Sequence, residues 1–402
     1  MAKLTAPSAP GPAPAAAGHA APLFEAGFRP FFLGAMIYGA LAMAAWMAEF
    51  VFGLSLPGAV LYGSLWHAHE MVYGYGAAVV AGFLLTAARN WTGLPTANGG
   101  ALAALFALWV AARLAFAFMP ASPVAPVLDA LFNLALFVAV AQPIVRVRQW
   151  RQLGILTKLL LIGLGNTVFY LGAAGVLENG MRLAVHGGVY VLIGLILTMA
   201  RRLIPFFTER GVGAPVTLRN AAWLDGACLA SYLAWFVLVL FTSETRIAAL
   251  FALLLTALHA LRLGFWWTPL VLARPLLWSL HLSYACMVLA FALAAAAGFG
   301  WLAPSLALHM FALGGIGLVT ISMMARVSLG HTGRNVHAAP AGLTWVFALG
   351  GACIVTRVLL PLALPGHYLV LVVVAQALWI ACFGLLTWMY APILLAPRVD
   401  AG

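Results

Sequence analysis

Apolar runs separated by short polar breaks dominate the pattern of this chain. Each run is close to the roughly 20 residues that an α-helix needs to cross the hydrocarbon core of a bilayer. The breaks contain proline, glycine or charged residues, which commonly end helices. The runs fall at about 31–52, 60–88, 100–119, 124–146, 157–176, 181–205, 220–242, 246–264, 276–298, 304–326, 341–363 and 368–396. The pattern therefore predicts an all-α polytopic membrane protein with about twelve transmembrane helices.

The composition supports this fold class. Of 402 residues, 65% are hydrophobic and only 7% are charged, and the mean hydropathy is +1.06. A soluble protein carries about 25% charged residues. The formal net charge of +11 does not indicate nucleic-acid binding, because basic residues of membrane proteins gather in cytoplasmic loops. The lipid bilayer is therefore an expected partner, and nucleic acid is not.

The basic residues lie in alternate loops, which predicts the orientation of the chain. Loops of the first set follow the second, fourth, sixth, eighth and tenth spans. They and the adjoining span ends carry Arg89, Arg146, Arg148, Arg151, Lys158, Arg201, Arg202, Arg210, Arg219, Arg262, Arg274, Arg326 and Arg334. The other loops are nearly bare, with Arg182 and Arg246 at their edges. By the positive-inside rule, both termini are predicted to be cytoplasmic.

Neither the N-terminal residues nor the cysteines are predicted to form a functional site. Residues 1–22 are rich in Ala and Pro and lack the segments of a cleaved signal peptide, so we expect a disordered leader. The remainder, 23–402, is predicted to be one transmembrane domain. The cysteines lie singly in apolar runs, which favours core packing over disulfides or a metal site. They are Cys228, Cys286, Cys353 and Cys382.

Three predicted spans share an order of features that indicates an internal repeat. The second, sixth and tenth spans each carry a histidine near the outer end, then glycines, then an arginine at the cytoplasmic end. The histidines are His69, His186 and His309, and the arginines are Arg89, Arg201 and Arg326. We therefore predict a threefold repeat of four helices over about 23–150, 151–268 and 269–402. Chance recurrence in glycine-rich spans is the alternative.

The second span contains the stretch with the most chemistry, Trp66-His67-Ala68-His69-Glu70-Met71. Ionisable side chains at membrane depth are costly unless they find internal partners, so they are functional candidates. On a helix, His67 and His69 are about 200° apart and cannot easily chelate one ion together. We therefore expect this helix to contribute to two different sites.

Four histidines are predicted to lie in one layer, roughly 10 Å inside the outer edge of the membrane. Neutral imidazole binds haem iron, copper or zinc. We predict that His67 and His69 each ligate iron in a different site, with His186 and His309 as the opposing ligands. The alternative is a single haem, with the other histidine of the pair hydrogen-bonded in the core. His281, in the ninth span, is the remaining candidate ligand for a non-haem metal.

Two charged residues join the candidate cofactor-binding residues. Glu70 can accept the second N–H of a ligating imidazole, carry protons, or pair with an arginine, and the sequence does not separate these roles. Arg326, at the cytoplasmic end of the tenth span, is the second candidate. The sequence identifies no catalytic residue.

Several motifs resemble the signatures of the NnrS family. Besides the stretch at 66–71, they are Phe28-Arg29-Pro30-Phe31-Phe32, Asn90-Trp91-Thr92-Gly93, Arg202-Leu203-Ile204-Pro205-Phe206-Phe207-Thr208, Arg274-Pro275-Leu276-Leu277-Trp278 and Arg326-Val327-Ser328-Leu329-Gly330-His331-Thr332-Gly333-Arg334. The resemblance implies a bacterial inner-membrane protein that contains haem, expected to be of b type, and copper. It also implies a role in nitric-oxide metabolism or in tolerance of nitrosative stress, with nitric oxide or a related small molecule as partner.

The architecture is also similar to the catalytic subunit of haem-copper oxidases and nitric oxide reductases, which has twelve spans in three arcs. The seventh span here, 220–242, has no histidine, so the copper ligands of those enzymes are not reproduced. A haem-dependent oxidoreductase acting on nitric oxide is therefore one interpretation among several. The alternatives are a transporter of copper, haem or a small anion, and a sensor or binder without turnover. Transporters more often have spans broken at mid-membrane, and the second, sixth and tenth spans, which lack proline except at their ends, do not favour that alternative.

Overall fold

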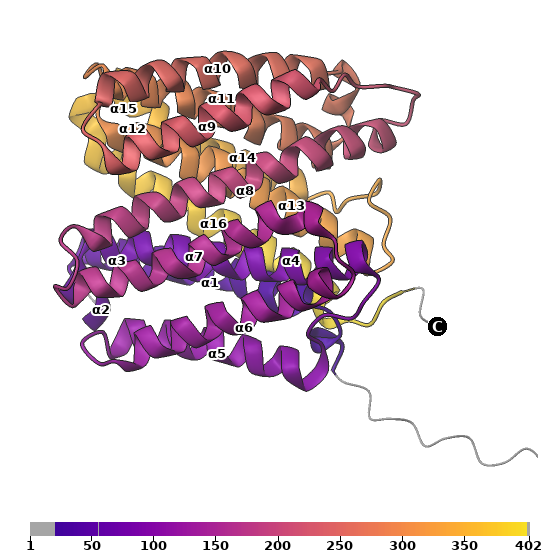
Figure 1. The fold of residues 1–402 in the computed structure, drawn as a ribbon, viewed down its shortest axis with the longest axis horizontal. Helices are drawn as coiled ribbons and strands as arrows, with labels where there is room; N and C mark the ends of the chain where they lie inside the picture. The colour runs from indigo at the N-terminus through magenta and orange to yellow at the C-terminus, as the bar shows by residue number, and fades with distance from the viewer. Residues whose placement is uncertain (1–20, 55, 400–402) are drawn as a thin grey trace, which may run out of the picture.

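The computed structural model describes residues 21–54 and 56–399, and the predicted leader lies almost entirely outside this range. In the described part every regular element is helical (Figure 1). Twelve helices are long and apolar enough to cross a membrane. The prediction of an all-α membrane protein with twelve spans is confirmed.

The twelve spans follow the chain in order, several of them in consecutive segments. They are α1 (Phe28–Phe52); α3 (Ser64–His69), η2 (Glu70–Gly76) and α4 (Ala77–Thr92); α5 (Gly99–Phe118); α6 (Val124–Arg146); η3 (Trp150–Gln152) and α7 (Leu153–Ala173); α8 (Gly180–Gly211); α9 (Ala222–Phe241); α10 (Thr245–Trp266); α11 (Pro275–Gly298); α12 (Pro304–His309), η5 (Met310–Gly317) and α13 (Leu318–His331); α14 (Leu343–Ile354), η6 (Val355–Leu359) and α15 (Leu360–Ala363); and η7 (Pro365–His367) with α16 (Tyr368–Leu395). Short elements outside the spans are η1 (Pro22–Phe24), α2 (Pro57–Tyr62) and η4 (Pro269–Ala273).

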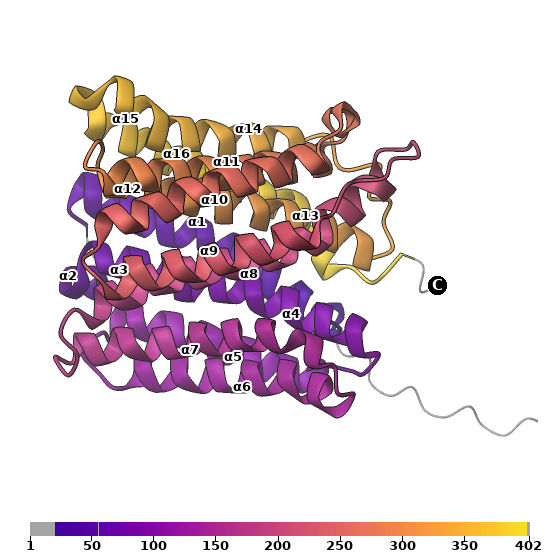
Figure 2. The ribbon, with the colours of Figure 1, turned by 45° about the horizontal axis from the view of Figure 1, so that its top comes forward.

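The helices run side by side along one direction, so that loops gather at two ends of the bundle (Figures 1 and 2). One end holds α2, α3, α12 and α15, on the left of Figure 1, and we call it the histidine end. The other end holds the far ends of α4, α8 and α13 and the C-terminal side of the chain, and we call it the arginine end. The bundle closes by packing α1 against α16.

The three spans related by the predicted repeat are the most buried ones. Within their apolar windows, 83% of residues are buried in the second span, 67% in the sixth and 72% in the tenth. The other nine spans range from 28% to 56%. Spans that are covered on most sides occupy the centre of a bundle, so the second, sixth and tenth spans form its core. The repeat itself stays a prediction.

Two of these central spans depart from α-helical geometry directly after a predicted site histidine. Wider π-helical turns form η2, after His69, and η5, after His309; a third π segment is η6 in the neighbouring eleventh span. π segments are rare and frequently mark functional sites. By contrast, α8 carries His186 in an unbroken α-helix, so the sixth span differs locally from the other two.

The sixth span is longer than its predicted extent. We expect it to end near residue 205, but α8 continues through Pro205 to Gly211. A proline removes one backbone donor and crowds the preceding turn, and it bends a helix without always ending it. Near the membrane edge, water and neighbouring groups can satisfy the freed carbonyl, which makes this proline tolerable.

Arg29 links the first and last spans at the arginine end. Its side chain is only 2% exposed, and Nη1 donates to the backbone oxygens of Leu394 at 2.9 Å and Ala396 at 2.6 Å. These oxygens lie at the C-terminus of α16, where carbonyls lack helical partners. The guanidinium therefore caps α16 from α1, which gives the arginine of the Arg-Pro-Phe-Phe motif a structural role.

The orientation can be tested with reporter fusions. Fusions at Arg148 and Arg210 are expected to report the cytoplasm, and fusions near Pro57 and Pro123 the periplasm, because arginine-rich loops stay inside. Activity of paired phosphatase and fluorescent reporters gives the measurement. A single fusion on the unexpected side would remove the assignment of the histidine end to the outer half of the membrane.

Candidate functional site

His67 and His69 on α3 face different surroundings, as the helical spacing predicts. His69 contacts residues of the third and fifth spans, whereas His67 stacks on Trp46 of the first span and lies near His309 and Arg357 of the tenth and eleventh. A turn at Gly63 precedes α3, and its φ of +57° and ψ of −133° suit glycine and few other residues. One short helix therefore contributes to two separate clusters.

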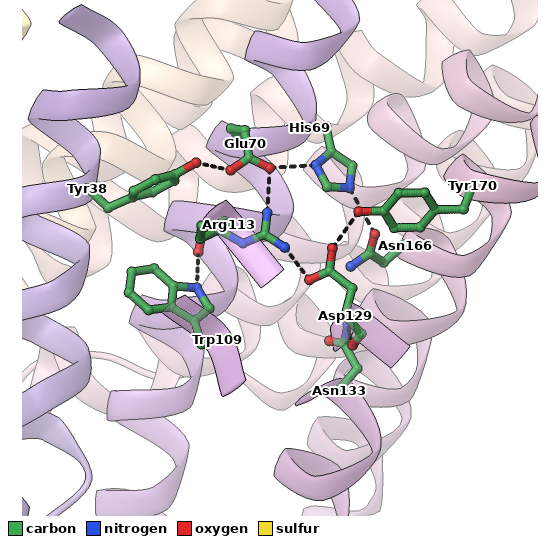
Figure 3. Close-up of polar contacts among 10 residues, drawn as sticks. Tyr38, His69, Glu70, Trp109, Arg113, Asp129, Asn133, Asn166 and Tyr170 are labelled. Carbon is green, nitrogen blue, oxygen red and sulfur yellow. Dashed lines mark hydrogen bonds and ion pairs between the residues drawn. The ribbon is translucent and has the colours of Figure 1, made fainter. Parts of the chain in front are cut away.

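The first cluster is a buried charge network around Glu70 (Figure 3). The Glu70 carboxylate accepts hydrogen bonds from the guanidinium of Arg113 on α5 and the hydroxyl of Tyr38 on α1. Arg113 also pairs with the carboxylate of Asp129 on α6, which accepts a further bond from the Tyr170 hydroxyl at 2.6 Å. The exposed fractions are 0% for Glu70, 3% for Arg113 and 1% for Asp129. The network therefore joins five spans through charged and hydroxyl groups in the membrane interior.

His69 belongs to this network and uses both of its ring nitrogens. Nδ1 donates to Oε1 of Glu70 at 2.8 Å, and Nε2 lies 2.9 Å from Oδ1 of Asn166 on α7. The ring is fully buried and packs against Phe116 and Phe169. No nitrogen of His69 is free for a metal in this arrangement. The surroundings of His69 match the alternative in which one of His67 and His69 is hydrogen-bonded in the core.

The contacts in this network bear on the three predicted roles of Glu70. The carboxylate pairs with Arg113, which is one of its three predicted roles, and accepts a hydrogen bond from His69. Orienting a metal-ligating imidazole and carrying protons stay predictions. The π segment that begins at Glu70 is held from the same side, because the Trp109 indole N–H donates to the oxygen of Gly74 at 3.1 Å. The network thus fixes the rotation of the second span, and with it the direction of His67.

His67, His309 and Arg357 form the second cluster. We call its two histidines, His67 and His309, the histidine pair. The His67 ring stacks on Trp46, with centroids 5.2 Å apart and an interplanar angle of 11°. His309 and Arg357 lie close enough to His67 for their charges to interact with it. Nδ1 of His67 is buried and has no hydrogen-bond partner in the described part of the chain.

His309 is oriented by its own helix. Nδ1 donates to the backbone oxygen of Ser305 at 2.7 Å, and Nε2 lies 3.2 Å from Nη2 of Arg357 on η6. Metal-ligating histidines commonly donate one ring N–H to a carbonyl in this way, which directs the other nitrogen toward the ligand. The Arg357 guanidinium lies over the Tyr368 ring at 5.4 Å, and its Nη1 is buried without a hydrogen-bond partner.

These observations would fit a haem held through histidine better than a compact metal site. A buried imidazole nitrogen without a partner is unfavourable, and a metal bond would satisfy it. His67 offers one such nitrogen, whereas Nε2 of His309 lies 3.2 Å from Nη2 of Arg357 and would have to leave that contact to bind a metal. Within 21–54 and 56–399, no group of three or more His, Cys, Asp and Glu residues lies close enough to hold a metal ion. The described side chains therefore do not form a copper site with three ligands of these four residue types.

The other two predicted histidine ligands lie in different surroundings. His186 is partly exposed, and both its hydrogen bond, from Nδ1 to the Arg182 oxygen at 2.8 Å, and its ring contact with Tyr190 stay within α8. His281 is buried, with Nδ1 3.0 Å from the Leu277 oxygen and Nε2 3.1 Å from the Trp266 oxygen. A metal at His281 would have to displace one of these contacts. Both assignments stay predictions.

Arg326 lies on α13 toward the arginine end, away from the histidine pair. Its guanidinium stacks on Phe207 at 4.0 Å, and the side chain lines a small cavity there. Sequence reasoning missed Arg113 and Arg357, which prove central to the two clusters. Each is a lone arginine inside an apolar run, and that costly placement was the available signal.

The model of a family described as NnrS protein matches residues 22–398, nearly the whole chain. A comparison with curated proteins found no match.

Proposed function

The chain belongs to the NnrS family, and we propose that it is a haem protein of the bacterial inner membrane that binds nitric oxide. The iron is held by His67 on α3 and His309 on α12, in the outer half of the membrane. Both termini lie in the cytoplasm. The role is in nitric-oxide metabolism or in protection against nitrosative stress.

One observation carries this proposal. Nδ1 of His67 is the ring nitrogen in the Trp-His-Ala-His-Glu-Met stretch that is buried and lacks a hydrogen-bond partner among the described residues. The neighbouring His69 has both nitrogens engaged, so the two histidines are chemically distinct despite their closeness in sequence. A buried, unpaired imidazole beside a second imidazole favours a ligand over a packing role.

The surrounding side chains would prepare this site for a haem. Haem, when bound, supplies an iron centre that binds diatomic gases such as nitric oxide. Trp46 holds the His67 ring flat against its own, and the Ser305 carbonyl fixes the tautomer of His309. Arg357 places a positive charge beside the pair, and no acidic side chain among the described residues pairs with it. That charge would stabilise a carboxylate of the cofactor or an anionic ligand.

Copper, the second metal that the family resemblance implies, has a weaker structural case. His186 and His281 are the remaining predicted ligands, and each would act with at most one other His, Cys, Asp or Glu of the described chain. A copper ion bound there would need water, backbone or a thioether as further ligands. We keep copper as part of the proposal without assigning its ligands.

The absorption spectrum of the purified protein tests the proposal. We expect a Soret band after expression in a haem-sufficient host, and a shift of that band when nitric oxide is added without oxygen. Metal analysis of the same sample should give iron in proportion to protein. A preparation that is folded but has no Soret band and no iron would overturn the proposed function.

A further inference from the structure

A small cavity opens at the arginine end, at the opposite end of the tenth span from the histidine pair. Its volume is about 100 Å³. The end of α8, the start of α11, the α13 side chain of Arg326 and the loop after α13 enclose it. The share of liquid volume of one water molecule is about 30 Å³, so the cavity holds about three waters or one small polyatomic ion.

The side chains that line this cavity carry positive charge without negative charge. Arg274 and Arg326 both line it, as does His337, and no aspartate or glutamate does. Neither arginine forms an ion pair with an acidic residue in the described part of the chain. The nearest carboxylate along α8, that of Glu209, accepts the backbone N–H of Leu218 at 2.8 Å and so has a partner elsewhere.

The backbone and an aromatic ring reinforce this electrostatic arrangement. The cavity touches Leu276 and Leu277 in the first turn of α11, a helix of 24 residues whose N-terminal N–H groups add partial positive charge. Phe207 supports the Arg326 guanidinium from one side at 4.0 Å, which limits its rotation. Two arginines held around one cavity repel each other unless an anion lies between them.

We propose that this cavity binds one small oxyanion, of the nitrite or phosphate class, through the guanidinium groups of Arg274 and Arg326. Planar guanidinium groups match the paired oxygens of such anions and form charge-assisted hydrogen bonds with them. The oxyanion is either free in the cytoplasm or the phosphate of a phospholipid headgroup, since the cavity lies near the membrane edge. The site is separate from the proposed haem site.

Titration calorimetry of the full-length protein in a neutral detergent tests this site. Inorganic phosphate and sodium nitrite are titrated into the wild type, Arg274→Gln and Arg326→Gln. Loss of one charge-assisted contact is expected to weaken binding by roughly tenfold or more. The matched control is Arg210→Gln, because Arg210 also stacks on an aromatic ring, Phe206 at 4.3 Å, but does not line the cavity. Its binding should equal that of the wild type.

Native mass spectrometry of the same samples separates the two sources of the oxyanion. A free-anion site gives binding of phosphate or nitrite that the two variants weaken. A headgroup site gives a retained phospholipid on the wild type and on Arg210→Gln that is lost from Arg326→Gln. Wild-type protein that binds neither anion and retains no phospholipid would overturn the proposal without recourse to any variant. Equal weakening by Arg210→Gln would also overturn it.

Discussion

Replacement of Arg113 with methionine is expected to destabilise the protein by about 3–5 kcal/mol, the effect of breaking a buried ion pair from one side. The methionine leaves the carboxylates of Glu70 and Asp129 in the membrane interior without their shared cation. Because all three side chains are nearly fully buried, solvent cannot replace the lost partner. Thermal unfolding of the purified variant in detergent gives the measurement, with the exposed Arg182→Met as control.

A rescue experiment distinguishes the lost charge from lost packing. Glu70→Gln and Asp129→Asn introduced together with Arg113→Met remove the uncompensated charges while keeping the side-chain shapes. The triple variant is expected to recover much of the lost stability, since a neutral group is far less costly to bury. An Arg113→Met protein as stable as the wild type would show that the network does not hold these spans together.

Loss of the cofactor is expected when either member of the histidine pair is replaced. His67→Ala and His309→Ala should each lower the haem content at least about tenfold, because a missing ligand weakens binding more than a missing outer partner does. His186→Ala is the control and should retain its haem, since its contacts stay within α8. Haem per protein, measured as the pyridine haemochrome, reports the result.

The double variant His67→Ala/His309→Ala tests whether the two histidines hold the same iron. If His67 and His309 hold the same iron, the variant that lacks both should lose no more haem than either single variant loses. Additive losses from two separate populations would indicate two sites. Retention of the full haem content in both single variants would place the cofactor elsewhere in the bundle.

The membrane spans and the divided role of α3 follow from local rules. A lipid interior satisfies no backbone hydrogen bonds, so long apolar runs must be helices, and their lengths determine the count. Likewise, the rotation of about 100° per residue determines that His67 and His69 face apart, whatever surrounds the helix. These features depend on neighbours within a few residues, which the sequence displays directly.

The partners of those histidines depend on contacts between distant segments. Arg113 lies 43 residues from Glu70 and 16 from Asp129, and Arg357 lies 48 residues from His309. Hydrophobic periodicity gives the buried face of each helix but not which residue of another helix meets it. In nearly uniformly apolar spans even that face is weakly marked, because lipid and protein interior favour the same side chains.

The predicted equivalence of the second, sixth and tenth spans is another feature that could be predicted only in part from the sequence. Their histidines occur at matching positions, and the structure places all three spans at the centre of the bundle. The π segments after His69 and His309 change the direction of the following side chains, and α8 has no such segment near His186. Such local changes of helix type leave no clear mark in hydropathy.

The most direct measurement of the central claim compares His67→Gln with His69→Gln in one haem determination. Glutamine keeps a polar side chain at each position, so both variants retain hydrogen-bonding capacity in the core. With His67 as the iron ligand and His69 as a member of the charge network, His67→Gln should lose the haem. His69→Gln should keep it, at a lower melting temperature. The reverse result, or the loss of distinct spectral components from the two variants, would contradict a single iron held by His67 and His309.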